Sequence, residues 1–358
     1  MPDRRDVLLG SAALALGGLS GCSSTVGGAY DTTMSRLRAP LGPTPDLPDF
    51  VRYATLAPNG HNTQPWRFAA TRAGVDILPD LSRRTPVVDP DDHHLFVSLG
   101  CAAENLAIAA SASGRPASIG FDPSGNGRIA IGLASGQSRD LALCRAIPAR
   151  QSTRSPYDRR AIPVEDLRSL ERAAAVPGVS VLLITDPPGR ERVLETVLHA
   201  NDLQMGDPAF MAELMLWLRF NEAAALRTGD GLYSACSGSR TSPTWLGKRM
   251  FPLFFTKASE TERYTEQLRS SSGIAVFIGD RADRDHWVRV GRSFERFALQ
   301  ATVLGLRHAH VNQPIEVPAV RSAFAKSLGL GDGRPDLVIR FGAAPALPMA
   351  MRRAPKIT

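Results

Sequence analysis

Two stretches of the chain share one pattern of apolar and small residues. Residues 99–110 and 290–301 both place such side chains at helical spacing, and both run on to a glycine. A helix with one apolar face belongs in a core, and its alanines allow another helix to approach closely. The glycines that match between the copies are Gly100 with Gly291 and Gly114 with Gly305. We therefore predict two central, buried helices from two related halves of one chain.

Short runs rich in β-branched and aromatic residues, closed by Asp, Pro or Gly, predict strands around these helices. The expected strands are 67–70, 75–78, 180–185, 274–278 and 337–341. Residues 190–270 are expected to be mostly helical, with a Gly/Ser-rich interruption at 228–242. Strands and helices do not alternate regularly, so the pattern favours an α+β fold with mixed sheets over a doubly wound parallel sheet.

The first 46 residues differ in character from the rest. Arg4 and Arg5 precede an apolar run from Val7 to Leu19, which is typical of a twin-arginine export signal and too short for a membrane span. Leu-Ser-Gly-Cys at residues 19–22 resembles a lipoprotein processing site that would leave Cys22 lipidated; cleavage elsewhere is the alternative. We expect a signal at 1–22, a flexible linker at 23–46, and a periplasmic or envelope protein that contacts the membrane only through Cys22.

Composition narrows the range of partners. The formal net charge of +7 is spread along 358 residues without a basic block, so nucleic acid is not an expected partner. Cys101, Cys144 and Cys236 lie far apart and show no Cys-x-x-Cys spacing, which favours buried thiols, although one pair could form a disulfide.

The boundary between the two related halves is expected near residues 140–148. This gives a first half at 47–145 and a second half at 146–358.

A turn between a helix and a strand carries the first candidate site. Pro58, Asn59 and Gly60 lead into the residues His-Asn-Thr-Gln-Pro-Trp at 61–66. A proline before a tryptophan gives a stiff turn, the indole anchors it in the core, and the amides of Asn62 and Gln64 can face a planar ligand. An ordinary helix-to-strand turn is the competing interpretation.

Arginines provide the second candidate site. Arg150, Ser152 and Arg154 alternate along an extended segment, so their side chains project to one side, which suits a phosphate and a ribityl chain. A solvated basic loop is the alternative. Two further arginines, Arg352 and Arg353, follow the last expected strand.

These motifs together resemble the FMN-dependent nitroreductase family. Residues 62–66 are similar to its Asn-x-Gln-Pro-Trp signature, residues 150–154 to its Arg-x-Ser-x-Arg/Lys segment, and residues 314–316 to its Pro-Ile-Glu segment. Arg353 matches the arginine of the Lys-x-Arg pair near the family's carboxyl end, but Met351 replaces the lysine, a loss that Arg352 could repair. The resemblance covers residues 47–355.

The family resemblance implies a bound FMN and a set of residues that hold it. The implied cofactor-binding residues are Pro58, Asn59, Gly60, Asn62, Gln64, Arg150, Ser152, Arg154, Ile315, Glu316, Arg352 and Arg353. A main-chain N–H of the 314–316 segment is expected to donate to flavin N5, and Glu316 is expected to have a positioning role. No residue is assigned as catalytic, because the flavin supplies the chemistry.

The distribution of motifs between the halves implies a single site. In ordinary nitroreductases one subunit supplies the arginine segment and the other the amide-rich turn; here the turn is in the first half and the arginines are in the second. The reciprocal pair is missing, since residues 178–180 replace the turn. The chain therefore resembles the Acg-type branch, a fused pseudo-dimer, with one flavin site and a helical lid at about 205–265.

The function implied is an envelope oxidoreductase that passes a hydride or electrons to a small planar acceptor, quinone-like or nitroaromatic. NADPH is scarce outside the cytoplasm, so a quinol or a protein is the expected donor. The alternatives are a flavin-sequestering protein without turnover and, third, a flavin-free lipoprotein that contacts a partner. Asp89, His93, His94, His308 and His310 could suggest a metal, but none has a complete ligand set, and no metal is expected.

Overall fold

The computed structural model describes residues 23–331 and 333–358, so the expected export signal and Cys22 lie outside the described residues. Its main feature is one order of elements that occurs twice. In the first half the elements are α2 (Leu47–Thr55), β1 (Trp66–Ala70), β2 (Gly74–Pro79), α3 (His93–Ala112), β3 (Ala117–Asp122) and β4 (Arg128–Leu133). In the second they are α5 (Val164–Ala174), β5 (Val179–Ile184), β8 (Gly273–Gly279), α11 (Arg284–Val303), β9 (Arg307–His310) and β10 (Leu337–Gly342).

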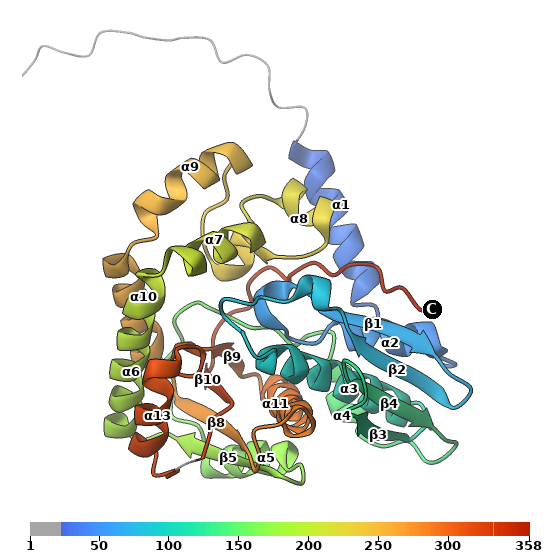
Figure 1. The fold of residues 1–358 in the computed structure, drawn as a ribbon. Helices are drawn as coiled ribbons and strands as arrows, with labels where there is room; N and C mark the ends of the chain where they lie inside the picture. The colour runs from blue at the N-terminus through green and yellow to red at the C-terminus, as the bar shows by residue number, and fades with distance from the viewer. Residues whose placement is uncertain (1–22, 332) are drawn as a thin grey trace, which may run out of the picture.

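Each half forms a four-stranded antiparallel sheet. The strand order is β1-β2-β4-β3 in the first and β5-β8-β10-β9 in the second, so corresponding strands hold corresponding places. Figure 1 shows the two sheets on opposite sides of α3 and α11, which lie between them. The predicted α+β fold with two related halves is confirmed.

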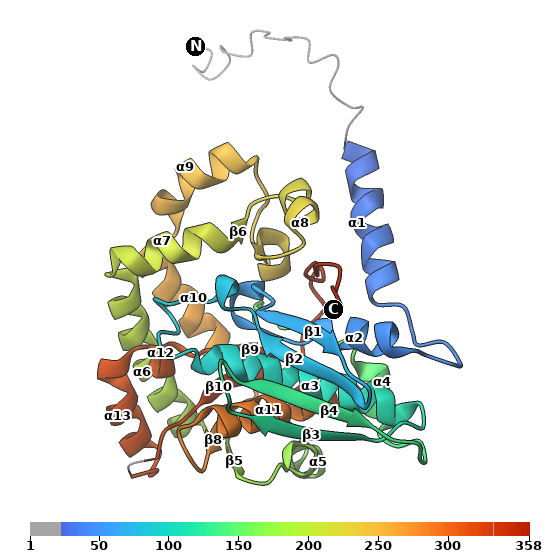
Figure 2. The ribbon, with the colours of Figure 1, turned by 45° about the vertical axis from the view of Figure 1, so that its right-hand side comes forward.

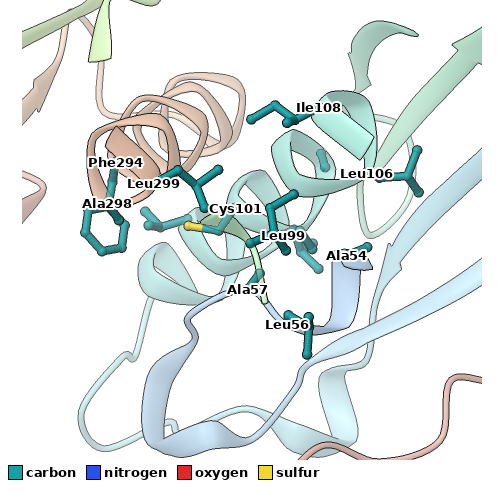
Figure 3. Close-up of a cluster of buried hydrophobic side chains, with 14 of the residues drawn as sticks. Ala54, Leu56, Ala57, Leu99, Cys101, Leu106, Ile108, Phe294, Ala298 and Leu299 are labelled. Atoms are coloured by element: carbon teal, nitrogen blue, oxygen red, sulfur yellow. The ribbon is translucent and has the colours of Figure 1, made fainter. Parts of the chain in front are cut away.

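The two central helices cross at the glycines that the sequence comparison aligned. A Cβ on Gly100 would lie 2.1 Å from the carbonyl oxygen of Val288, and a Cβ on Gly291 would lie 2.0 Å from that of Val97. Val97 and Val288 each precede their glycine by one helical turn, so the contact is symmetric. Leu99, Cys101, Phe294 and other side chains of the two helices fill the core beside it (Figure 3). Only glycine allows this approach.

The halves differ by one large insertion between β5 and β8. It contains α6 (Pro187–Met205), α7 (Pro208–Trp217), β6 (Leu218–Arg219), α8 (Glu222–Thr228), β7 (Leu232–Tyr233), α9 (Thr244–Phe254) and α10 (Lys257–Arg269). The prediction of a helical region with an interruption at 228–242 is confirmed. Helices α7, α8 and α9 form the upper part of the molecule in Figure 1.

Remaining helices connect or flank these units. They are α4 (Leu141–Ala146) at the junction of the halves, and α12 (Gln313–Glu316) and α13 (Pro318–Ser327) between β9 and β10.

Within the described residues, α3 is the one helix long and apolar enough to span a membrane, but it is mostly buried between the sheets as a core helix. Cys101, Cys144 and Cys236 are buried free thiols, as favoured above.

The segment expected to be a flexible linker is largely a helix, α1 (Ser23–Leu37), which corrects that prediction. Tyr30 is buried, packs on Tyr233 at a ring separation of 5.6 Å and donates its hydroxyl to the carbonyl of Met349. Met34 and Leu37 join the same apolar cluster, one and two turns further along. Tertiary contacts of this kind stabilise a helix that composition alone does not reveal. Figure 2 shows α1 along one edge of the molecule.

Candidate functional site

The turn at residues 58–65 has an unusual backbone. His61, Asn62 and Gln64 all have positive φ angles, of 49°, 54° and 54°. Non-glycine residues seldom adopt this region, and several together occur where the surrounding structure holds them. Trp66 is buried at the start of β1 and anchors the turn, as the sequence predicts.

The amides in this turn bind the protein itself. The Asn62 side chain donates to the carbonyls of Gly231 and Met351 at 3.0 and 3.1 Å. The Gln64 side chain donates to the carbonyl of Gly229 at 2.8 Å and accepts the Arg353 N–H at 2.8 Å. The two amides therefore join the first-half turn to the insertion and to the tail of the second half.

A small cavity of about 80 Å³ lies beside this turn and gathers four arginines from distant parts of the chain. They are Arg38, Arg150, Arg154 and Arg352. Asn59, Asn62 and Ser152 also line it. The arginine segment and the amide-rich turn, predicted to meet from opposite halves, are therefore brought together.

The arginines are held mainly by backbone carbonyls, which fix their positions without neutralising them. Arg352 donates to the carbonyls of Thr55, Leu56 and Ala57 at 2.7, 3.2 and 3.2 Å, at the end of α2. Arg38 donates to the carbonyl of Pro148 at 2.5 Å. Among the described residues, Nε of Arg38 and both Nε and Nη1 of Arg150 are buried without a hydrogen-bond partner.

One carboxylate lies close to this group. Glu295 is fully buried, with Oε1 3.4 Å from Nε of Arg150. Burial raises the pKa of Glu295 to about 7, against the opposing effect of Arg150. Burial and then the neighbouring arginines lower the pKa of Arg352 to about 9, and burial and then Arg150 lower that of Arg38 to about 10. A buried excess of positive charge is costly unless an anion compensates it, so the cavity suits a dianion such as a phosphate ester.

A second cavity of about 850 Å³ adjoins the small one. Pro58, Asn59 and Arg154 line both, so the two spaces share walls at the turn and at the arginine segment. Apolar side chains from the insertion cover the larger cavity. They include Phe210 and Leu214 of α7, Phe220, and Leu246, Met250, Phe251 and Phe254 of α9. A large apolar space joined to a compact cationic one matches a planar ring with a phosphorylated tail.

The 314–316 segment lies at this cavity in a different way from that expected. Both Ile315 and Glu316 donate their backbone N–H to the carbonyl of Asn312, at 2.8 and 2.9 Å, within the short helix α12. Neither N–H is therefore free for flavin N5, and the Ile315 side chain is buried in the core. The Glu316 side chain does line the cavity, where it accepts a hydrogen bond from Gln204 at 2.8 Å. Burial raises its pKa.

The residues carried over from the family divide into two groups. Those that line a cavity are Pro58, Asn59, Gly60, Asn62, Arg150, Ser152, Arg154, Glu316 and Arg352. Gln64, Ile315 and Arg353 line neither. The guanidinium of Arg353 donates instead to the carbonyl of Gln64 at 2.7 Å, so Arg352, not Arg353, is the tail arginine at the cationic cavity.

Several cavity residues were not predicted. Arg38 lies in the segment that was expected to be a flexible linker, so no role was predicted for it. Gln313 immediately precedes the Pro-Ile-Glu segment, and its Oε1 is buried without a partner among the described residues. His61, His94 and His310 also line the larger cavity, and burial lowers the pKa of His61 to about 4 and that of His310 to about 3.

The acidic and histidine cluster before α3 has a structural explanation. Ligand atoms of Asp89, His93 and His94 lie within 4.8 Å of one another. Both Asp89 oxygens, however, accept backbone N–H groups at the start of α3, from His94 and Leu95, at 2.9 Å each. Nε2 of His93 lies 3.0 Å from Oδ1 of Asp336. These side chains therefore cap and anchor the start of α3.

Comparisons with known proteins find similarity to proteins named as nitroreductases. No family model matches it. "Putative NAD(P)H nitroreductase Rv3131" of Mycobacterium tuberculosis is 26% identical over 303 residues, covering 82% of this chain and 83% of the relative. The protein named acg of the same organism is 25% identical over 317 residues, covering 85% and 92%. The nitroreductase NfnB of Mycobacterium smegmatis overlaps 57% of this chain and 87% of its own, at 14% identity and a TM-score of 0.37.

The two M. tuberculosis relatives match 82% and 85% of this chain, which is more than either half alone. The resemblance inferred from the sequence is therefore confirmed: the chain is a homologue of the proteins named as NAD(P)H nitroreductases, the Acg protein among them.

Proposed function

We propose that this protein binds FMN and acts as an oxidoreductase of the nitroreductase type. The observation that carries the proposal is the cationic cavity, with four arginines near one buried carboxylate, joined to a larger apolar cavity behind the residue 58–65 turn. The names of the relatives support the same activity. Bound FMN would supply the redox chemistry, taking up a hydride or electrons from a donor and passing them to an acceptor.

The residues have distinct roles in this proposal. Arg38, Arg150, Arg154 and Arg352 hold the phosphate, and Ser152 contacts the ribityl end. Pro58 to Gly60 and the α12 segment border the ring. Asn62 and Gln64 keep the turn in place through their bonds to the insertion and the tail. The aromatic and aliphatic side chains of α7 and α9 exclude water from the larger cavity.

Location and reaction partners complete the proposal. Export by the twin-arginine route and attachment at Cys22 would place the protein in the envelope, where a quinol or a protein would serve as donor. The names of the relatives point instead to a nicotinamide donor for those proteins. The acceptor proposed is a small planar quinone or nitroaromatic, because the larger cavity is mainly apolar and roomy.

The phosphate assignment can be tested by comparing FMN with riboflavin, which lacks the phosphate. Wild-type protein is expected to bind FMN at least about 100-fold more tightly, because charged hydrogen bonds contribute about 1.5–3 kcal/mol each. In Arg150→Gln this preference falls about tenfold or more while riboflavin affinity changes little. The measurement is a fluorescence titration of cofactor-free protein.

Arg145→Gln is the matched control, since Arg145 is exposed on α4 close to the same segment. Equal affinity of the wild-type protein for the two flavins would refute the phosphate assignment. Turnover is then tested by reducing the yellow protein with dithionite, NADPH or a quinol and adding a quinone. Flavin that binds but cannot be reoxidised by any acceptor would favour the sequestering function, and protein that takes up no flavin would favour partner contact.

A further inference from the structure

The insertion carries an unpartnered apolar surface. Of the large apolar side chains in the described residues, the four most exposed lie on α7 and α9. They are Leu216 at 73%, Trp245 at 71%, Phe254 at 69% and Leu253 at 66%. Isolated exposed apolar residues are ordinary, but such a concentration on two neighbouring helices marks an interaction surface.

Helix α9 buries little of its surface against the rest of the protein. Its one buried residue is Gly247, which lies against the ring of Phe220. Neighbouring parts of the insertion are fixed more firmly: Glu213 of α7 accepts the N–H groups of Val87 and Val88 at 3.0 and 3.1 Å. An amphipathic helix with its apolar residues split between a cavity and the outside requires a second apolar partner.

All charged residues in the segment that contains α9, residues 231–259, are basic. No aspartate or glutamate occurs between Asp230 and Glu260. Arg240, Lys248 and Arg249 are exposed in this interval and form no ion pair within the described part of the chain. Cations beside an exposed tryptophan and leucine are the combination that binds the interface of an anionic bilayer.

The position of α9 agrees with this partner. Figures 1 and 2 both show α9 at the same end of the molecule as the start of α1, which follows Cys22 directly. A lipid on Cys22 would therefore hold this end toward the membrane. The cationic and apolar residues of α9 would then face the same bilayer as the anchor. A second copy of the chain is a poorer partner, because a symmetric contact would set Lys248 and Arg249 against their own copies.

We propose that α9, through Trp245, Lys248, Arg249 and Leu253, docks on the surface of an anionic lipid bilayer. Phe254 both lines the larger cavity and is 69% exposed, so it marks an opening of that cavity on the docking side. If the proposed function holds, lipid-soluble acceptors enter there from the bilayer. The docking itself does not depend on flavin or on turnover.

The test uses the full chain with Cys22→Ser, so that no lipid is attached, and vesicles with and without an anionic phospholipid. Of the four tryptophans, Trp66 and Trp287 are buried, Trp217 is half-buried and Trp245 is exposed. Anionic vesicles are expected to shift its emission to shorter wavelength, and brominated lipid is expected to quench it; Trp245→Phe identifies the signal. Lys248→Gln with Arg249→Gln should weaken binding about 30-fold, at about 1 kcal/mol per cation.

The controls are matched in chemistry and remote in position. Leu141→Gln with Val164→Gln alters exposed apolar residues on α4 and α5, and Arg72→Gln with Arg145→Gln removes two exposed cations. Both control variants should bind as the parent does, while Leu253→Gln should bind more weakly. Trp245 emission that is indifferent to vesicles, equal loss in the controls, or a stable dimer abolished by Leu253→Gln would each overturn the proposal.

Discussion

Arg38, the first residue after α1, contributes a guanidinium to the cavity that also holds Arg150 and Arg352. Its backbone contacts fix it there: Nη1 donates to the carbonyl of Pro148, while Nε has no partner among the described residues. A buried guanidinium with a free N–H beside other cations is placed to bind an anion.

Replacing Arg38 with glutamine should therefore weaken FMN binding about 10- to 100-fold, as expected for the loss of one charged hydrogen bond. Riboflavin affinity should change by less than about threefold, because only the phosphate is addressed. The measurement is titration of cofactor-free protein. Arg36→Gln is the control, since Arg36 is exposed in the last turn of α1, two residues before Arg38. An Arg38 variant that keeps wild-type FMN affinity would exclude Arg38 from the site.

At the level of single residues, the sequence located the site better than it assigned roles. Arg150, Ser152 and Arg154 reach the cavity because their alternation in an extended segment determines which way they project. Gln64 and Arg353 could not be placed in this way. Their partners are each other and Gly229, which is remote in the chain, and no local pattern encodes such a contact.

At the level of elements, the crossing of α3 and α11 is the contact that joins the halves. Its close approach depends on Gly100 and Gly291, which lie against backbone carbonyls that cannot rotate away. The matching glycines of the two sequence copies predicted this pair of buried helices. The strands β3 and β4 were missed, because glycines interrupt their apolar alternation.

Gly291→Ala should lower the free energy of unfolding by about 3 kcal/mol or more, because its Cβ would lie 2.0 Å from the Val97 oxygen. Gly120→Ala is the control: Gly120 lies in β3, and a Cβ there meets nothing within 4 Å. Urea unfolding of both variants provides the comparison. Equal stability of Gly291→Ala and wild type would show that the helices do not cross at this residue.

At the scale of the whole molecule, buried ionisable groups couple stability to pH. Asp336 is 1% exposed, accepts the Gly279 N–H at 2.6 Å and lies beside His93. Burial raises its pKa from 3.8 to about 7. Between these values the folded protein holds a proton that the unfolded chain has released, so this group makes stability fall as pH rises.

Asp336→Asn removes that titration. Relative to wild type, the variant should therefore gain roughly 3 kcal/mol of unfolding free energy when the pH is raised from about 4.5 to about 7.5. Urea unfolding at the two pH values measures this change. Glu195→Gln, at an exposed position on α6, should run parallel to wild type; a constant offset between Asp336→Asn and wild type would contradict the assigned burial effect.

The overall architecture followed from the sequence because the duplicated helix and the strand runs encode it locally. The attachment of α1 and the path of the tail did not follow. Each is stabilised by contacts between distant segments, such as Tyr30 with Met349 and Thr358 with Phe68. The same kind of contact completes the cationic cavity, whose arginines come from the segment just after α1, the middle of the chain and the tail.

A dianion bound in that cavity would hold three separate segments of the chain together. Without it, mutual repulsion among the guanidinium groups favours release of α1 and the tail together, leaving both as loose ends. Proteases cut where a folded chain loosens. We therefore expect proteases to cleave cofactor-free molecules before cofactor-bound ones.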